Sequence, residues 1–166
     1  MKKILLMVLA IFIIPGAALC QQIEKGDREV QATASFMSMD NISMLILSGT
    51  YGYYYSEKLQ LGAGPVITHT EAFGFDDTTI GLKLFVRHNF TARDRLVPYI
   101  AGQWYQHDIS PDDPIGFLDL SFIQFGGGFK YFVNEYIAYD ISGNIGISLG
   151  EGETNLLIVA GISAFL

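Results

Sequence analysis

Residues 122–147 read FIQFGGGFKYFVNEYIAYDISGNIGI, in which two runs of alternating apolar and polar residues flank a short turn at 133–136. Alternation with a period of two predicts β-strands, so this stretch is expected to form an antiparallel hairpin. One face of the hairpin is apolar and carries Ile123, Phe125, Phe129, Tyr131, Ile137, Tyr139, Ile141, Ile145 and Ile147. The other face is polar and glycine-rich, with Gln124, Gly126, Gly128, Lys130, Ala138, Asp140, Ser142, Asn144, Gly146 and Ser148. This combination is typical of a narrow barrel with lipid outside and a filled polar interior.

The overall composition favours the same interpretation. Half of the 166 residues are hydrophobic, which is high for a soluble domain, so some apolar surface must face something other than water. No run of about 18 or more apolar residues follows the first 20 residues, so any membrane crossing must use strands and not a helix. The net charge of −7 excludes nucleic acid as a partner.

Residues 1–20 have the features of a secretory signal peptide. Lys2 and Lys3 precede an apolar run at 4–14 and a break rich in small residues, so cleavage is expected after Cys20. The barrel domain is then expected at 21–166. The alternative is a lipid-anchored Cys20, but Leu19 stands where a lipid-attachment signal prefers a small residue. No cysteine follows Cys20, and no cofactor is expected.

Further alternating segments predict eight strands in total. Those outside the opening stretch are expected at 30–38, 43–54, 59–68, 79–90, 96–106 and 155–166. Residues 23–29 are expected to be a solvent-exposed lead-in, and residues 69–78 a longer acidic loop. Pro65 has no amide donor, so it is expected at a bulge or where pairing frays near that loop. In the last strand Leu156 and Ile158 are expected to face outward, which leaves Phe165 inside.

The connections between the expected strands alternate in length. Short turns around Glu57, Asp94 and Asn134 alternate with four connections that are mostly longer and acidic. Short turns at one end and longer loops at the other are the asymmetry of bacterial outer-membrane barrels, whose termini both lie in the periplasm. The expected fold class is therefore all-β, an eight-stranded antiparallel up-and-down transmembrane β-barrel.

The chain resembles the small eight-stranded bacterial outer-membrane β-barrel family, the OmpA-like and OmpX-like barrels. Residues 58–64 (KLQLGAG), 97–102 (VPYIAG), 125–132 (FGGGFKYF) and the apolar last strand carry the resemblance, which covers the whole of 21–166. The chain departs from the family at its end, because Phe165 is penultimate and Leu166 last where the family usually ends on an aromatic residue. The resemblance implies an outer-membrane protein that contacts lipid, lipopolysaccharide and the outer-membrane insertion machinery. A monomer is expected.

Inward-facing polar residues form the first candidate site. They are Lys83, Arg87, Gln103, Gln124, Lys130, Asp140 and Asn144. They could form a selectivity filter or a catalytic cluster, but an eight-stranded barrel is just wide enough to be filled by its own side chains, which favours mutual pairing. Counting across the short turns predicts that Lys83 lies near Gln103 and that Lys130 pairs with Asp140.

Acidic residues in the longer loops form the second candidate site. They are Glu71, Asp76, Asp77, Asp108, Asp112, Asp113, Glu151 and Glu153, with Asp40 in the first turn. These loops contain no lysine or arginine. Such residues either keep the rim soluble or form a crown that binds divalent cations bridging lipopolysaccharide or a basic partner. No single loop shows an ordered calcium-ligand pattern.

The expected function is structural or surface-interacting and not enzymatic. One alternative is an outer-membrane lipid-modifying hydrolase using His107, Ser110 and Asp108, although their spacing matches no catalytic motif. The other alternative is a soluble periplasmic barrel that carries an apolar ligand. Such a carrier would place its large apolar residues inward, which is opposite to the observed pattern.

Overall fold

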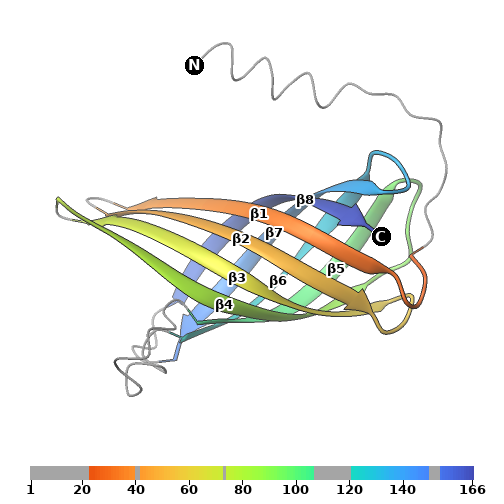
Figure 1. Cartoon of the computed structure of the whole chain (residues 1–166), viewed down its shortest axis with the longest axis horizontal. Helices are drawn as coiled ribbons and strands as arrows, with labels where there is room; N and C mark the ends of the chain where they lie inside the picture. The colour runs from red at the N-terminus through yellow and green to blue at the C-terminus, as the bar shows by residue number, and fades with distance from the viewer. Residues whose placement is uncertain (1–22, 40–41, 73, 107–120, 150–153) are drawn as a thin grey trace, which may run out of the picture.

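The computed structural model describes residues 23–39, 42–72, 74–106, 121–149 and 154–166. They contain eight strands: β1 (Arg28–Met39), β2 (Ile42–Tyr54), β3 (Leu59–Ala72), β4 (Phe75–Asn89), β5 (Leu96–Gln106), β6 (Ser121–Phe132), β7 (Ile137–Ser148) and β8 (Thr154–Phe165). Each strand is antiparallel to the next, and β8 pairs with β1, so the sheet closes into a barrel (Figure 1). The expected fold class is confirmed. No helix among these residues is long and apolar enough to cross a membrane.

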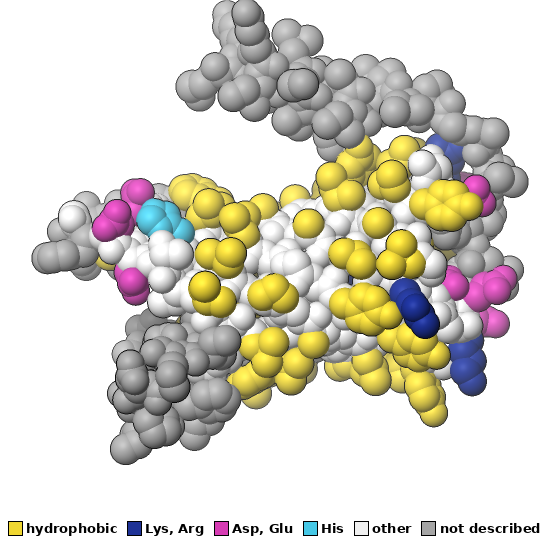
Figure 2. Space-filling view, viewed as in Figure 1, with side chains coloured by type: hydrophobic (Ala, Val, Ile, Leu, Met, Phe, Trp, Pro, Cys, Tyr) yellow, Lys and Arg dark blue, Asp and Glu magenta, His cyan; other side chains and the backbone are white. Residues whose placement is uncertain are grey.

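Alternation along each strand decides which side chains face outward. In β7, Ile141 and Ile145 are 45% and 55% exposed, whereas Ser142 and Asn144 are buried. The register expected for β8 is also correct, because Leu156 is exposed and Leu157 and Phe165 are buried. The outer wall is therefore apolar, and hydrophobic side chains spread over it in Figure 2.

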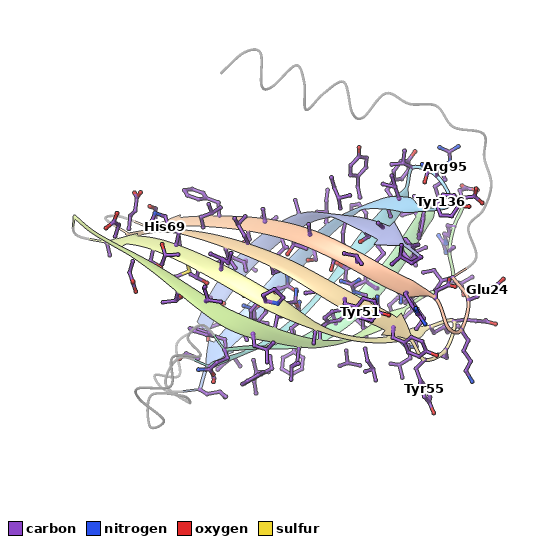
Figure 3. All side chains as sticks on the ribbon, viewed as in Figure 1. Glu24, Tyr51, Tyr55, His69, Arg95 and Tyr136 are labelled. Carbon is purple, nitrogen blue, oxygen red and sulfur yellow. The ribbon has the colours of Figure 1, made fainter. Side chains whose placement is uncertain are left out.

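The two ends of the barrel differ. One end, here called the turn end, carries the connections 55–58, 90–95 and 133–136 together with Ile23 and Leu166. The other end, here called the hairpin end, is where β1 meets β2, β3 meets β4, β5 meets β6 and β7 meets β8. Figure 3 labels His69 at the hairpin end and Glu24, Tyr55 and Tyr136 at the turn end.

The acidic loop expected at 69–78 is instead the tip of a long hairpin. β3 continues to Ala72 and β4 starts at Phe75, so residues of the expected loop pair in a regular ladder. β4 pairs with β5 only from Leu82 onward, so seven residues of β4 project beyond β5, or roughly 23 Å. The prediction was wrong because charged residues are tolerated in a strand tip that has water on both faces. The connection between β3 and β4, expected to be long, is consequently short.

Pro65 lies in the middle of β3 and not near its outer end. The β2–β3 ladder pairs Ser48 with Val66 and Tyr51 with Ala63, and the two pairs between them are missing without any change of register. The structure therefore has no bulge at Pro65, contrary to one of the two expectations. Pairing is interrupted as expected, but seven residues before the end of the strand.

The lead-in expected at 23–29 to be exposed is partly buried, which corrects that prediction. Ile23 is 6% exposed and packs inside the turn end with Tyr54, Val97, Phe132, Ala138 and Phe165. Backbone bonds hold the segment there, since the Gly26 N–H donates to the Tyr54 carbonyl at 2.9 Å. An open mouth lined by apolar side chains must be covered, and the neighbouring chain segment does so.

A second apolar layer lies farther toward the hairpin end and contains Ile46, Val66, Tyr105, Leu157 and Val159.

Candidate functional site: the ion network inside the barrel

Glu29 on β1 is the central acceptor of the buried network. Its side chain is 1% exposed and forms an ion pair with Lys130 from β6. It also accepts hydrogen bonds from Tyr54 Oη at 2.9 Å, Gln60 Nε2 at 2.8 Å and Ser163 Oγ at 2.7 Å. These donors come from β2, β3 and β8, so one carboxylate joins strands across the lumen.

Asp140 on β7 is the second buried carboxylate. It accepts a hydrogen bond from Gln31 Nε2 at 2.8 Å and another from the Tyr99 hydroxyl at 2.5 Å. The donors lie on β1 and β5, on opposite sides of β7 in strand order. Hydrogen bonds from several neutral groups disperse the charge of a buried carboxylate, which lowers the free-energy penalty of its burial.

Arg87 on β4 connects the two carboxylates. Its Nη1 lies 3.5 Å from Glu29 Oε1, and its Nη2 lies 3.8 Å from Asp140 Oδ2. Its guanidinium also donates to Gln60 Oε1 and Gln31 Oε1, both at 3.2 Å. The ring of Tyr99 lies against the guanidinium, with 4.3 Å from Cζ to the ring centroid. Arg87 therefore makes one network of two ion-pair centres.

The ladder position expected for Lys130 is correct, but the ion-pair partner expected for its side chain is wrong. Lys130 lies directly opposite Asp140 in the β6–β7 ladder, as counted from the turn. Its ammonium nevertheless pairs with Glu29 and lies 3.3 Å from the Tyr54 hydroxyl. A long lysine side chain can reach across a narrow lumen, and Arg87 with two neutral donors already occupies Asp140.

The partner expected for Lys83 is also wrong. Lys83 lies opposite Tyr105 in the β4–β5 ladder, and its ammonium is 5.2 Å from that ring centroid and 5.8 Å from that of Phe85. Gln103 instead donates to Asn144 Oδ1 at 2.9 Å and accepts from the Tyr105 hydroxyl at 3.1 Å. Within the described part of the chain, no carboxylate forms an ion pair with Lys83.

Gln124 completes the expected interior set. It is 3% exposed and lies opposite Gln103 in the β5–β6 ladder. All seven residues of the expected interior cluster thus face the lumen, six of them buried and Gln103 partly so. The structure brings Arg87, Lys130 and Asp140 into one network and leaves Gln103, Gln124 and Asn144 in a neutral group nearer the hairpin end.

Sequence reasoning missed the main acceptor of the network. Glu29 lies in the segment 23–29 that is expected to be a polar lead-in, although it continues the inward series of Gln31 and Thr33 with the same period of two. Extending that series by one step would have found it. Nothing local to β3 indicates that Gln60 contacts both Glu29 and Arg87.

The acidic set is only partly described by the structure. Glu71 lies on β3 and Asp76 and Asp77 on β4, near the tip of the projecting hairpin. Asp40, Asp108, Asp112, Asp113, Glu151 and Glu153, as well as His107 and Ser110, lie outside the described residues. Among the residues described, no three His, Cys, Asp or Glu side chains converge to hold a metal ion.

Comparison with known proteins shows similarity of fold to solved structures and no similarity of sequence to a known family. No protein-family model matches the sequence, and no curated protein matches it. A de novo designed transmembrane β-barrel is similar with a TM-score of 0.58 and 13% identity, over 88% of this chain and 100% of that one. The N-terminal β-barrel domain of Pseudomonas aeruginosa OprF is similar with a TM-score of 0.58 and 16% identity, over 86% of this chain and 98% of that one.

The fold is that of a transmembrane β-barrel. The outer-membrane protein OprG from Pseudomonas aeruginosa is less similar, with a TM-score of 0.49 and 11% identity over 88% of this chain and 99% of that one. A shared fold at such low identity concerns architecture alone.

Proposed function

We propose that this chain is an integral protein of a bacterial outer membrane, with both termini in the periplasm, a closed lumen and no enzymatic activity. It acts at the cell surface through its hairpin end. The observation that carries the proposal is one continuous apolar wall around an interior in which Glu29, Arg87, Lys130 and Asp140 form a paired network. A soluble protein rarely exposes such an extensive apolar surface.

The aromatic and basic residues support this orientation. Exposed tyrosines gather toward the turn end, and they include Tyr51, Tyr53, Tyr55, Tyr131 and Tyr136. Aromatic side chains at strand ends are typical of the boundary between lipid and water. The exposed basic residues Lys25, Lys58 and Arg93 also lie at the turn end, whereas the connections of the hairpin end contain none.

The acidic hairpin tip supports a role in surface interaction. Glu71 lies opposite Asp76 in the ladder, and like charges in facing positions destabilise a sheet. Divalent cations, or a basic partner, would relieve this repulsion. We propose that the tip interacts with lipopolysaccharide through such cations. The described residues contain no preformed metal centre, so the cations are attracted by the combined negative charge of the tip and not held by one set of ligands.

The interior of the barrel weighs against one of the alternative functions. A soluble carrier of an apolar ligand requires an apolar interior, but the middle of this lumen holds Glu29, Arg87 and Asp140. That arrangement weighs against the carrier. Nothing among the described residues favours a hydrolase over the proposed role.

Cell fractionation combined with an epitope insertion tests the proposal. Gly74 has a φ of +85° in the exposed turn of the projecting hairpin, so an epitope inserted there should be tolerated. We expect the protein in the outer-membrane fraction, with antibody binding to intact cells. A matched insertion at Glu135, in a turn of the opposite end, should bind antibody only after permeabilisation. Recovery in the soluble periplasm without detergent would contradict the proposal.

Lipopolysaccharide binding tests the role of the acidic tip. Asp76→Asn combined with Asp77→Asn should weaken Mg²⁺-dependent retention of lipopolysaccharide on the purified barrel, and EDTA should abolish the difference from the parent. Glu57→Gln with Asp94→Asn at the turn end removes the same charge and should leave retention unchanged. Equal retention by all three proteins in Mg²⁺ would exclude a role for the tip.

A further inference from the structure

A groove of about 350 Å³ crosses the apolar outer wall between β4, β5 and β6. Val86, Ile100 and Phe125 form its sides and are 44%, 53% and 62% exposed. Gly102 and the backbone of neighbouring residues form its floor. Its volume lies at the lower end of the roughly 300–1,000 Å³ that small-molecule sites occupy.

Gly102 creates this groove without any steric need for a glycine. A Cβ at this position would lie 3.5 Å from the Phe125 ring and 3.7 Å from Val86, which are ordinary contacts. The inward Gly128 is different, because a Cβ there would overlap the backbone of Ile141. Glycine within a strand weakens it and often marks a place where a ligand approaches closely. Packing therefore does not require a glycine at position 102, and its missing side chain leaves room for an occupant.

The groove extends toward the turn end as far as His88. His88 lines it on that side and is the only polar side chain among its lining residues. His88 lies opposite Leu59 in the β3–β4 ladder, next to the exposed Lys58. The exposed Arg93 lies in the turn that joins β4 to β5, the strands on either side of the groove. Lys58 and Arg93 therefore lie in connections at the end of the barrel toward which the groove extends.

We propose that the groove is a phospholipid site. One acyl chain lies over Gly102 between Ile100 and Phe125, and the phosphate of the same lipid lies toward Lys58 and Arg93. The lipid belongs to the leaflet at the turn end, because the connections of the opposite end have acidic residues and no lysine or arginine with which to bind a phosphate. This inference rests on the proposed placement of the wall in a membrane.

The single tryptophan of the chain provides a direct reporter. Trp104 is two residues from Gly102 on the same outward face of β5, opposite Leu84 on β4 and Ile123 on β6. Its fluorescence can be measured in vesicles of phosphatidylcholine containing increasing fractions of brominated phosphatidylglycerol, since bromine quenches only by contact. At low fractions of brominated lipid, we expect quenching about fivefold above the level that random lipid contact would give. This is the factor by which one basic residue favours binding to an anionic lipid surface.

Matched glycine variants separate the groove from the rest of the wall. Gly102→Leu fills the groove and should reduce quenching to the random level, with Gly102→Ala intermediate. Gly49→Leu alters an outward glycine on β2, where a Cβ meets nothing within 4 Å, and should retain the excess. Lys58→Gln should lower the excess without filling the groove. Each value is normalised to the quenching of the same variant in fully brominated lipid.

The outcomes distinguish this inference from the proposed function. Quenching that rises in proportion to the brominated fraction in the parent protein would overturn the phospholipid site while leaving the membrane placement intact. Absence of quenching even in fully brominated lipid would overturn the membrane placement itself. A detergent-stable dimer that Gly102→Leu dissociates would show that a second copy occupies the groove, which also overturns the proposal.

Discussion

Glu29 shows how a single residue holds distant parts of this barrel together. It lies in the second position of β1, yet its carboxylate contacts side chains from β2, β3, β4, β6 and β8. Such a group is stabilising only while all its partners are present, because a buried charge that loses its counter-charge retains the full penalty of burial. Lys130 depends on it most, since Glu29 is its ion-pair partner.

Glu29→Gln tests this dependence. We expect the variant to lose about 3–5 kcal/mol of unfolding free energy, because Lys130 keeps its charge in the interior without a counter-charge. The measurement is reversible urea unfolding in lipid vesicles. Glu24→Gln makes the same chemical change at an exposed residue five positions away and should stay within about 0.5 kcal/mol of the parent. Equal stability of both variants would show that the network does not hold the barrel together.

At the scale of elements, length and pairing differ around the barrel. β3 and β4 have 14 and 15 residues, whereas β5 has 11, and the extra length projects at the hairpin end. β2 and β3 lie unusually close together where their pairing is interrupted near Pro65. A Cβ on Gly64 would overlap the backbone of Gly49 and Thr50 there. Register survives this gap because the pairs on both sides of it are in place.

Arginine substitutions on the strand faces test the lipid-facing wall. Leu84→Arg on β4 and Ile141→Arg on β7 should each lower the unfolding free energy by about 2–4 kcal/mol, because an arginine near the bilayer midplane must be desolvated or must draw water inward. Tyr55→Arg at the turn end should change it by only about 0–1 kcal/mol, since the interface hydrates the guanidinium. The measurement is again unfolding in vesicles. If Tyr55→Arg proved the most harmful of the three, the assignment of depth along the strands would be wrong.

The whole molecule has a layered interior. An apolar layer with Phe132 and Phe165 fills the turn end, the ion network follows, and the layer with Val66 and Leu157 lies toward the hairpin end. Ring packing makes the first layer dense, with 5.0 Å between the centroids of Phe132 and Phe165. Water and ions crossing the lumen would have to pass both apolar layers and separate paired charges.

Single-channel recording tests this closure. We expect small or absent conductance steps for the purified barrel in planar bilayers, because side chains from all eight strands fill the lumen. The recording should be repeated with the Glu29→Gln variant, since loss of that carboxylate removes a charge without removing either apolar layer. The parent and the variant should therefore both remain nearly silent. A large, steady, porin-like conductance of the parent would show that the lumen is open.

The sequence by itself determined the number of strands, their faces and their order, because a period of two assigns each side chain to lipid or lumen independently of the rest of the chain. The pattern correctly placed Ile141 outward and Asp140 inward, and it also predicted β8, which is nearly apolar on both faces. The predictions from the sequence were wrong where they relied on composition and not on periodicity. The charged residues at 69–78 form a regular ladder and not a loop, and Glu29 is buried in the lumen although it follows charged residues.

Only the tertiary structure decided which interior groups pair. Lys130 and Glu29 are 101 residues apart, and Gln31 and Asp140 are 109 apart. Register between neighbouring strands can be counted across a turn, but contacts across the lumen depend on the tilt and stagger with which the whole sheet closes. The groove at Gly102 arises in the same way, because its sides come from three strands and no local pattern in β5 reveals a hollow.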